Sequence, residues 1–246
     1  TKMIYDGLTE AGEKDVVSLV RCAWAGSQRY GALVWSGDIP STFESFKIQI
    51  VCGLQMAMAG IPWWTTDIGG FHDGDIRDPK FRELLIRWFQ YGAFCPVMRL
   101  HGHRSPYQAP LSSTGGGRCA SGAENEIWSY GEENYAIMKK YIELREELRP
   151  YTRRLMQEAS ETGAPVMRPL FYQFPEDERV WEIKDQFLFG DQYLVAPVTE
   201  YGAREREVYL PVGVLWTEQS TGKTYEGGRT VTADAPLDVI PVFVRG

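Results

Sequence analysis

The sequence has 246 residues, of which 43% are hydrophobic and 24% are charged, values typical of a soluble globular protein that needs no disulfide scaffold. No segment approaches the roughly 18 consecutive apolar residues of a membrane span. The net charge is −7 and no basic block occurs, which argues against partners such as nucleic acid or a membrane. A neutral substrate fits this composition better, and the high aromatic content (13%, with 8 Trp) suits stacking against sugar rings.

The cysteines and the first residues bear on processing and on metals. The four cysteines, Cys22, Cys52, Cys95 and Cys119, form no CxxC pair, so we expect neither a disulfide nor a structural metal. The chain begins Thr1-Lys2-Met3 without a signal-peptide pattern, and we expect the natural start to lie elsewhere.

The first half alternates apolar runs with helical periodicity, a pattern typical of a parallel sheet with crossover helices. We expect strands at residues 16–21, 32–35, 61–66 and 94–99. One helix is predicted from Phe43 to Ala57 with Gly60 as its cap, and another from Pro79 to near Gly92.

The pattern changes after Gly102. A Gly-, Ser- and Pro-rich loop is expected at 103–121, followed by one long helix at 132–161. From Pro165 onward, short strands separated by Gly and Pro predict an antiparallel β-sandwich, with strands at 187–190, 193–197, 208–211, 215–216 and 239–244.

A polar residue follows each of the four expected strands: Arg21, Asp38, Asp67 and His101. In an α/β barrel the chemistry lies on the loops at the carboxyl ends of the strands. Taken singly, a loop Asp before Gly is usually a turn residue, but four polar residues in corresponding positions indicate a site. Two carboxylates surrounded by hydrogen-bond donors and aromatic rings suit cleavage of a glycosidic bond.

A metal site is the competing interpretation, because His101 and His103 could join Asp67 around one ion. A bare HxH is a weak signal, however, and no third nitrogen or sulfur ligand stands at a telling spacing. Neither GxGxxG nor GxxxxGK[ST] occurs, so phosphate chemistry is not indicated. We therefore expect no metal and no cofactor.

Several longer motifs resemble a known family. They are Arg21-Cys22-Ala23-Trp24-Ala25-Gly26-Ser27-Gln28-Arg29-Tyr30-Gly31, Trp35-Ser36-Gly37-Asp38, Asp67-Ile68-Gly69-Gly70-Phe71, Arg87-Trp88 and Arg99-Leu100-His101. Together they resemble the catalytic domain of glycoside hydrolase family 31, the retaining α-glucosidases and α-xylosidases. The resemblance continues through Leu148-Arg149-Pro150-Tyr151, Pro165-Val166-Met167-Arg168 and Leu194-Val195-Ala196-Pro197-Val198, and so covers nearly the whole chain.

The resemblance implies a role for each candidate site residue. Asp38 matches the general acid/base of the family, while Arg21 and His101 match positions that hydrogen-bond hydroxyls of the sugar in the −1 subsite. Trp35 and Phe71 match its aromatic walls. Asp67 matches a polar residue lining the same pocket, although its carboxylate could instead hold the arginine or a loop amide.

The family's nucleophile is an aspartate after the fourth barrel strand, and no residue here matches it. Asp6 and Asp15 follow no apolar strand, and Met3 to Leu8 are typical of the end of a helix. The fold expected by resemblance is therefore α/β, with strands 5 to 8 of a (β/α)8 barrel at 1–160 and an incomplete antiparallel β-sandwich at 161–246. We expect the chain alone to be inactive and to need the missing N-terminal half as its partner.

The expected substrate is an α-linked oligosaccharide or glycoside with terminal glucose or xylose, and the motif at 23–31 looks most like that of bacterial members that include α-xylosidases. A catalytically silent sugar-binding or structural fragment is the alternative function. The bacterial cytoplasm is the expected compartment, with the periplasm or secretion as alternatives, and a homo-oligomeric parent is left open.

Overall fold

The computed structural model describes residues 1–118 and 120–246, so Cys119 lies outside the described residues. Its α-helices are α1 (Lys2–Glu10), α2 (Phe43–Met58), α3 (Pro79–Ala93), α4 (Glu132–Glu147) and α5 (Arg149–Thr162). Short 3-10 helices lie at η1 (Ser27–Tyr30), η2 (Gly115–Arg118), η3 (Ile127–Tyr130), η4 (Leu170–Tyr172) and η5 (Glu178–Glu182).

Three short parallel strands form the sheet of the first half, in the order β1 (Ser18–Val20), β2 (Ala32–Trp35) and β3 (Trp64–Thr65). Leu19 pairs with Leu33, and Val34 pairs with Trp64. The parallel sheet and its crossover helices are thus confirmed, with β1 and β3 shorter than expected. The Asp78 carboxylate caps α3 by accepting from Lys80 N–H at 2.9 Å, and Pro79 opens that helix as expected.

The fourth expected strand, at 94–99, is wrong, because the structure has no strand there. Phe94 is the C-cap of α3 and Cys95 N–H still bonds back to Gly92, so the segment begins as a helix end. Pro96 has no N–H to give to a ladder. The segment nevertheless lies against β3, because Val97 N–H donates to Trp64 O (3.3 Å) and Ile68 N–H donates to Arg99 O (3.2 Å).

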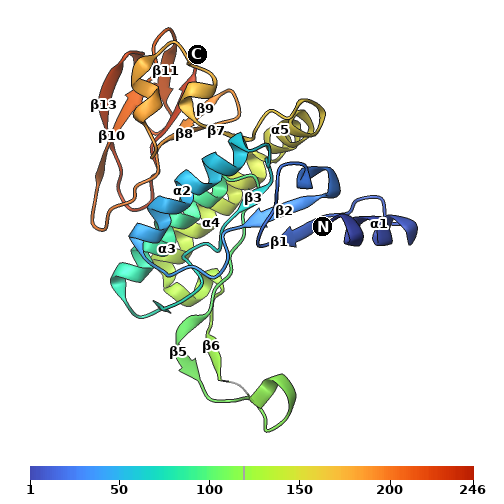
Figure 1. The fold of residues 1–246 in the computed structure, drawn as a ribbon. Helices are drawn as coiled ribbons and strands as arrows, with labels where there is room; N and C mark the ends of the chain where they lie inside the picture. The colour runs from blue at the N-terminus through green and yellow to red at the C-terminus, as the bar shows by residue number, and fades with distance from the viewer. Residues whose placement is uncertain (119) are drawn as a thin grey trace.

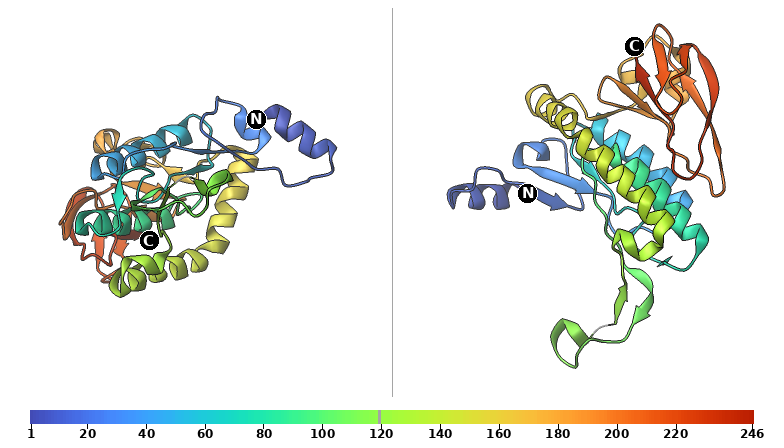
Figure 2. Two further views of the ribbon diagram at one scale, coloured as in Figure 1. Left: turned by 90° about the horizontal axis from the view of Figure 1, so that it is seen from below. Right: turned by 180° about the vertical axis from the view of Figure 1, so that it is seen from behind.

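The segment at 132–161 is helical as expected, but the prediction of one continuous helix is wrong. It is two helices, α4 and α5, which meet at Leu148. Pro150 lies in the first turn of α5, where its missing N–H is tolerated, whereas inside a continuous helix it would remove a hydrogen bond and clash with the preceding turn. The chain changes direction at this point (Figure 2).

The expected loop at 103–121 holds regular structure. β5 (Arg104–Gln108) pairs in parallel with β4 (Gly74–Asp75) and antiparallel with β6 (Ser121–Ala123). The hairpin of β5 and β6 extends away from the rest of the molecule (Figure 1).

The C-terminal part is rich in antiparallel strands. A six-stranded sheet runs in the order β12-β11-β14-β9-β8-β7, and β10 pairs with β13 apart from it. The bounds are β7 (Met167–Arg168), β8 (Phe187–Phe189), β9 (Tyr193–Val195), β10 (Glu205–Leu210), β11 (Leu215–Glu218), β12 (Thr224–Glu226), β13 (Arg229–Asp234) and β14 (Val242–Arg245). Both sheets contribute to one apolar cluster that includes Leu194, Val208, Trp216 and Phe243.

Helices α2, α3 and α4 lie between the parallel sheet and the C-terminal strands (Figure 1). Their apolar faces share a second cluster with the sheet and with β7 to β9, which includes Phe46, Trp88, Tyr91, Phe187 and Phe189. This core anchors β1 to β3 and leaves the loops after them free to carry polar groups. Within the described residues no helix is both long and apolar enough to cross a membrane.

Candidate active site

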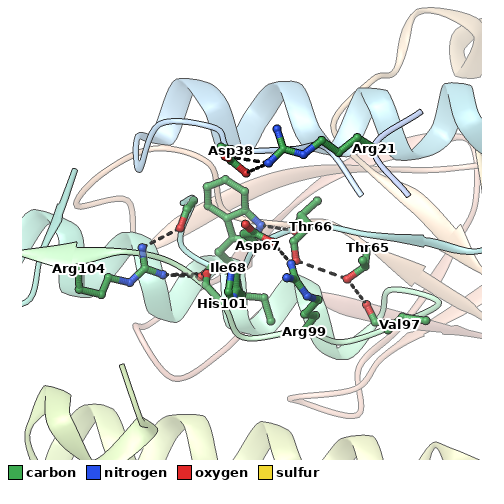
Figure 3. A network of polar contacts seen from close by, with 12 residues as sticks. Arg21, Asp38, Thr65, Thr66, Asp67, Ile68, Val97, Arg99, His101 and Arg104 are labelled. Carbon is green, nitrogen blue, oxygen red and sulfur yellow. Dashed lines mark hydrogen bonds and ion pairs between the residues drawn. The ribbon is translucent and has the colours of Figure 1, made fainter. Parts of the chain in front are cut away.

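The six residues predicted from the sequence lie at the carboxyl ends of the parallel strands or follow the segment packed beside them. Figure 3 shows Arg21, Asp38, Asp67 and His101 among them. Arg21 follows β1, Trp35 ends β2 and Asp38 follows it, Asp67 and Phe71 follow β3, and His101 follows the segment at 94–99. Parallel strands expose their carboxyl ends at one edge of the sheet, which is why residues far apart in sequence meet here. Ion pairs and contacts with aromatic rings connect these residues to one another or to a neighbouring arginine.

Asp38 lies in a turn that leaves its carboxylate accessible, with 32% of the side chain exposed. Gly37 before it has φ of 80°, a left-handed conformation that glycine adopts without strain. Arg21 Nη2 donates to Oδ1 (2.9 Å) and to Oδ2 (3.0 Å) of Asp38. The carboxylate is thus oriented by one guanidinium while remaining open to solvent.

Trp35 lies beside two guanidinium groups. The Arg21 guanidinium carbon is 5.3 Å from the Trp35 ring centroid, and that of Arg99 is 5.8 Å away. Cations at this range are attracted to the electron-rich face of an indole ring. The ring therefore joins the Asp38–Arg21 pair to the second ion pair of the site.

Asp67 is fully buried and forms that second pair. Its Oδ1 accepts from Arg99 Nη1, whereas Oδ2 has no hydrogen-bond partner among the described residues. Burial raises the pKa of Asp67, the charges of Arg99 and His101 oppose that rise, and Asp38 adds to it. Of the two roles weighed from the sequence, the structure shows an arginine held by Asp67, and it is Arg99 rather than Arg21.

The loop after β3 brings Phe71 next to His101, with ring centroids 5.6 Å apart. Phe71 N–H donates to Ile39 O at 2.8 Å, which ties this loop to the one that carries Asp38. The close approach depends on Gly70, whose φ is 76° and where a Cβ would lie 2.6 Å from Pro40 O. Phe71 and Asp38 are therefore linked through their backbones.

Two arginines of this region, Arg99 and Arg104, have roles that the sequence pattern does not predict. Arg99 stood in the quoted Arg99-Leu100-His101 motif, and its position two residues before His101 was the available signal. Arg104 fell within the expected loop, yet it is fully buried and donates to the carbonyls of Ile68, Gly70 and His101. Arginine is almost never fully buried without partners, but the sequence pattern carried no sign of that burial.

The alternative metal site finds no support in the geometry. Among residues 1–118 and 120–246, no group of three or more His, Cys, Asp or Glu side chains is arranged to hold an ion. The His103 ring lies 4.7 Å from that of Tyr107 and 6.4 Å from that of Phe71. Cys22, Cys52 and Cys95 are free thiols, and burial raises the pKa of Cys95 to about 12.

Comparisons with known proteins identify the family of the chain. Residues 1–155 match the model of the glycosyl hydrolases family 31 TIM-barrel domain, and residues 163–246 match that of the family 31 C-terminal domain. An α-xylosidase of Saccharolobus solfataricus is 38% identical over 245 residues, which is 100% of this chain and 31% of the relative. Alpha-xylosidase A of Aspergillus niger is 37% identical over 96% of this chain and 34% of the relative.

A solved structure of a family 31 α-xylosidase from a soil metagenome, complexed with xylose, superposes with a TM-score of 0.95 at 59% identity. It covers 99% of this chain, which corresponds to 36% of that protein. The chain thus spans about a third of the length of these relatives. With a barrel portion followed by a β-rich C-terminal part, both matched by the family models, the chain belongs to glycosyl hydrolase family 31.

Proposed function

We propose that this chain is part of a retaining α-glycoside hydrolase in which Asp38 is the general acid/base. The observation that carries the proposal is an accessible carboxylate after β2, oriented by Arg21, whose guanidinium lies over the Trp35 ring. Asp38 first protonates the leaving oxygen of the glycosidic bond. It then removes a proton from the water that releases the sugar.

The neighbouring residues suit the binding of one sugar ring. Arg21 and His101 supply hydrogen bonds to hydroxyls, and Trp35 and Phe71 supply apolar walls. Asp67 does not face this pocket directly, because its carboxylate is buried and paired with Arg99. We propose that Asp67 contributes to sugar binding through Arg99.

The double displacement needs a second carboxylate as nucleophile, about 5 to 5.5 Å from the first. Asp67 is unsuited to that role, since it is fully buried and one of its oxygens is bonded to Arg99. We therefore propose that the nucleophile belongs to a segment outside these 246 residues, the N-terminal half of the same barrel. In this scheme β1 to β3 and the segment at 94–99 take the places of barrel strands 5 to 8, residues 161–246 form a β-sandwich, and the domain boundary lies near residue 160.

For the substrate we propose terminal non-reducing α-linked xylose or glucose. The support is the names of the relatives, which include α-xylosidases and an α-glucosidase of Bacillus thermoamyloliquefaciens that is 37% identical over 92% of this chain. The two sugars differ only in a hydroxymethyl group. Both should therefore be offered in the test.

The purified chain, incubated with p-nitrophenyl α-xyloside and α-glucoside, should release no p-nitrophenol. Addition of the polypeptide that supplies the nucleophile should restore release. Asp38→Ala in this chain should then abolish cleavage of methyl α-glycosides, whose leaving group is poor, while sparing the activated p-nitrophenyl substrates more. Turnover by the chain alone would overturn the assignment of the nucleophile to another segment. Restored activity that survives Asp38→Ala on substrates with poor leaving groups would overturn the role of Asp38.

A further inference from the structure

Arg104, the first residue of β5, has a fully buried side chain whose five N–H donors are all used. Nε donates to Asn125 Oδ1 (2.9 Å). Nη1 donates to Gly70 O (2.7 Å) and Ser41 Oγ (3.4 Å), and Nη2 donates to Ile68 O (2.9 Å) and His101 O (3.3 Å). Because no donor is left over, this guanidinium is not available to a sugar.

Three acceptors of Arg104 belong to the two segments that carry Phe71 and His101, and Figure 3 shows Arg104 beside Ile68 and His101. Ile68 and Gly70 lie between Asp67 and Phe71, and the third carbonyl is that of His101 itself. One rigid group therefore fixes the loop after β3 relative to the segment that bears His101. These two segments carry Phe71 and His101, whose rings are in contact with centroids 5.6 Å apart.

The surroundings of the guanidinium are shaped to accept it. A Cβ at Gly102 would lie 2.4 Å from its atoms, and a Cβ at Gly69 or Gly74 would lie 3.1 Å away. On the far side, Asn125 Oδ1 also accepts from the hydroxyl of Tyr130 at 2.5 Å, which holds the amide toward Nε. No carboxylate among the described residues is bonded to Arg104, so its charge is balanced by carbonyl dipoles aimed at it.

We propose that Arg104 is a positioning residue, which holds Phe71 and His101 in the arrangement that receives the sugar. The proposal rests on the proposed function for its catalytic consequence but not for its structural one. Lysine keeps the charge but offers one nitrogen in place of a planar fork, so it cannot reach both loops at once. Arg104→Lys therefore tests the geometry of the guanidinium rather than its charge.

Arg87 provides a matched control. It is equally buried and also donates to main-chain carbonyls, those of Ala203, Ala235, Pro236 and Val239, but it touches no residue of the site. Hydrogen exchange followed by mass spectrometry compares Arg104→Lys, Arg87→Lys and the parent chain. Faster exchange is expected at the amides of Gly70 and His103 in Arg104→Lys alone, since these bond to Asp67 O and Phe71 O inside the two loops.

The same substitutions are then placed in the protein that joins this chain to the nucleophile. Arg104→Lys should lower kcat/KM about 10- to 100-fold with a raised KM, while Arg87→Lys should stay within about twofold of the parent. Unchanged exchange in the two loops, or a kcat/KM within about twofold of the parent despite faster exchange, would overturn the proposal. If the parent cleaves no α-glycoside, the proposed function fails, and the exchange experiment still decides whether Arg104 holds the loops.

Should Arg104→Lys fail to fold, Asn125→Ala removes the acceptor that Nε shares with the Tyr130 hydroxyl and lies outside both loops. It should give the same local increase in exchange and a smaller loss of kcat/KM. No change in either measurement would count against the positioning role.

Discussion

At the scale of single residues, the site is built from two carboxylate–arginine pairs, and the guanidinium groups of both pairs lie near the Trp35 ring. Asp38 with Arg21 is open to solvent, whereas Asp67 with Arg99 is closed. The two aspartates have the same side chain but different surroundings. Asp38 is accessible and can exchange a proton with substrate, whereas Asp67 is buried and holds Arg99 in place.

The buried pair gives a prediction on pH. Because the pKa of Asp67 is raised in the folded state, the native protein binds a proton more tightly than the unfolded chain does. The free energy of unfolding of the parent should therefore fall relative to that of Asp67→Asn as pH rises from below 3.8 through the raised pKa. Urea unfolding at a series of pH values measures the difference.

Asp75→Asn is the control, because Arg77 lowers the pKa of the half-buried Asp75 carboxylate. Its difference from the parent should have the opposite sign, with stability lost as pH falls through the lowered pKa. A parent that gains stability over Asp67→Asn as pH rises would contradict the burial argument.

The sequence could predict the residues that face the site but not those that support it. Each of the polar site residues follows an apolar run, so its position at the end of a strand can be predicted from the sequence. These residues are Arg21, Asp38, Asp67 and His101. The burial of Arg104 cannot be predicted in this way, because the space for its side chain is left by glycines 69, 74 and 102, which lie at separate places in the chain. Likewise, the choice of Arg99 rather than Arg21 as the partner of Asp67 follows from tertiary placement.

At the scale of elements, the loops after β2 and β3 depend on one glycine. Gly70 and Gly213 both have positive φ, but only Gly70 lacks space, since a Cβ there would meet Pro40 O at 2.6 Å while Gly213 faces open space. Gly213→Ala should cost about 1 kcal/mol of unfolding free energy for the strained backbone. Gly70→Ala should cost about 2–4 kcal/mol because a backbone clash is added.

Chemical denaturation of the two variants measures this difference. Equal losses at Gly70 and Gly213 would show that the two loops are not held in contact. Gly70→Ala should in addition weaken sugar binding, which Gly213→Ala should leave unchanged.

The elements predicted wrongly share a cause. Residues 94–99 have the composition of a strand, but Pro96 and the helix cap at Phe94 remove the donors that a ladder needs. The helix expected at 132–161 is continuous in periodicity, and its division at Leu148 depends on Pro150. Hydrophobic pattern located both segments correctly, whereas backbone chemistry decided their form.

At the scale of the whole molecule, α3 is bonded to the C-terminal part through buried polar groups. The Arg87 guanidinium donates to four carbonyls at 203, 235, 236 and 239, and Gln90 donates to Leu237 O at 2.7 Å. Burial lowers the pKa of Arg87 to about 10. These bonds fix the β-rich part against the helices that carry the parallel sheet.

Arg87→Met keeps most of the side-chain volume but leaves those carbonyls without their donor. We expect a loss of about 3–5 kcal/mol in unfolding free energy and separate unfolding transitions for the two parts. Differential scanning calorimetry measures both effects. Arg153→Met, at an exposed position of α5, is the control and should change stability by no more than about 0.5 kcal/mol; a similar small change for Arg87→Met would contradict the account.

Leaving-group dependence tests most directly whether Asp38 exchanges the proton with the substrate, as we propose for an α-glycosidase. In the protein that joins this chain to its nucleophile, kcat/KM of Asp38→Ala is compared for an alkyl α-glycoside and for an activated aryl α-glycoside. We expect a loss of about 100-fold or more for the alkyl substrate and a much smaller loss for the aryl one, since only the poor leaving group needs protonation. Equal losses for the two substrates would contradict the role of Asp38.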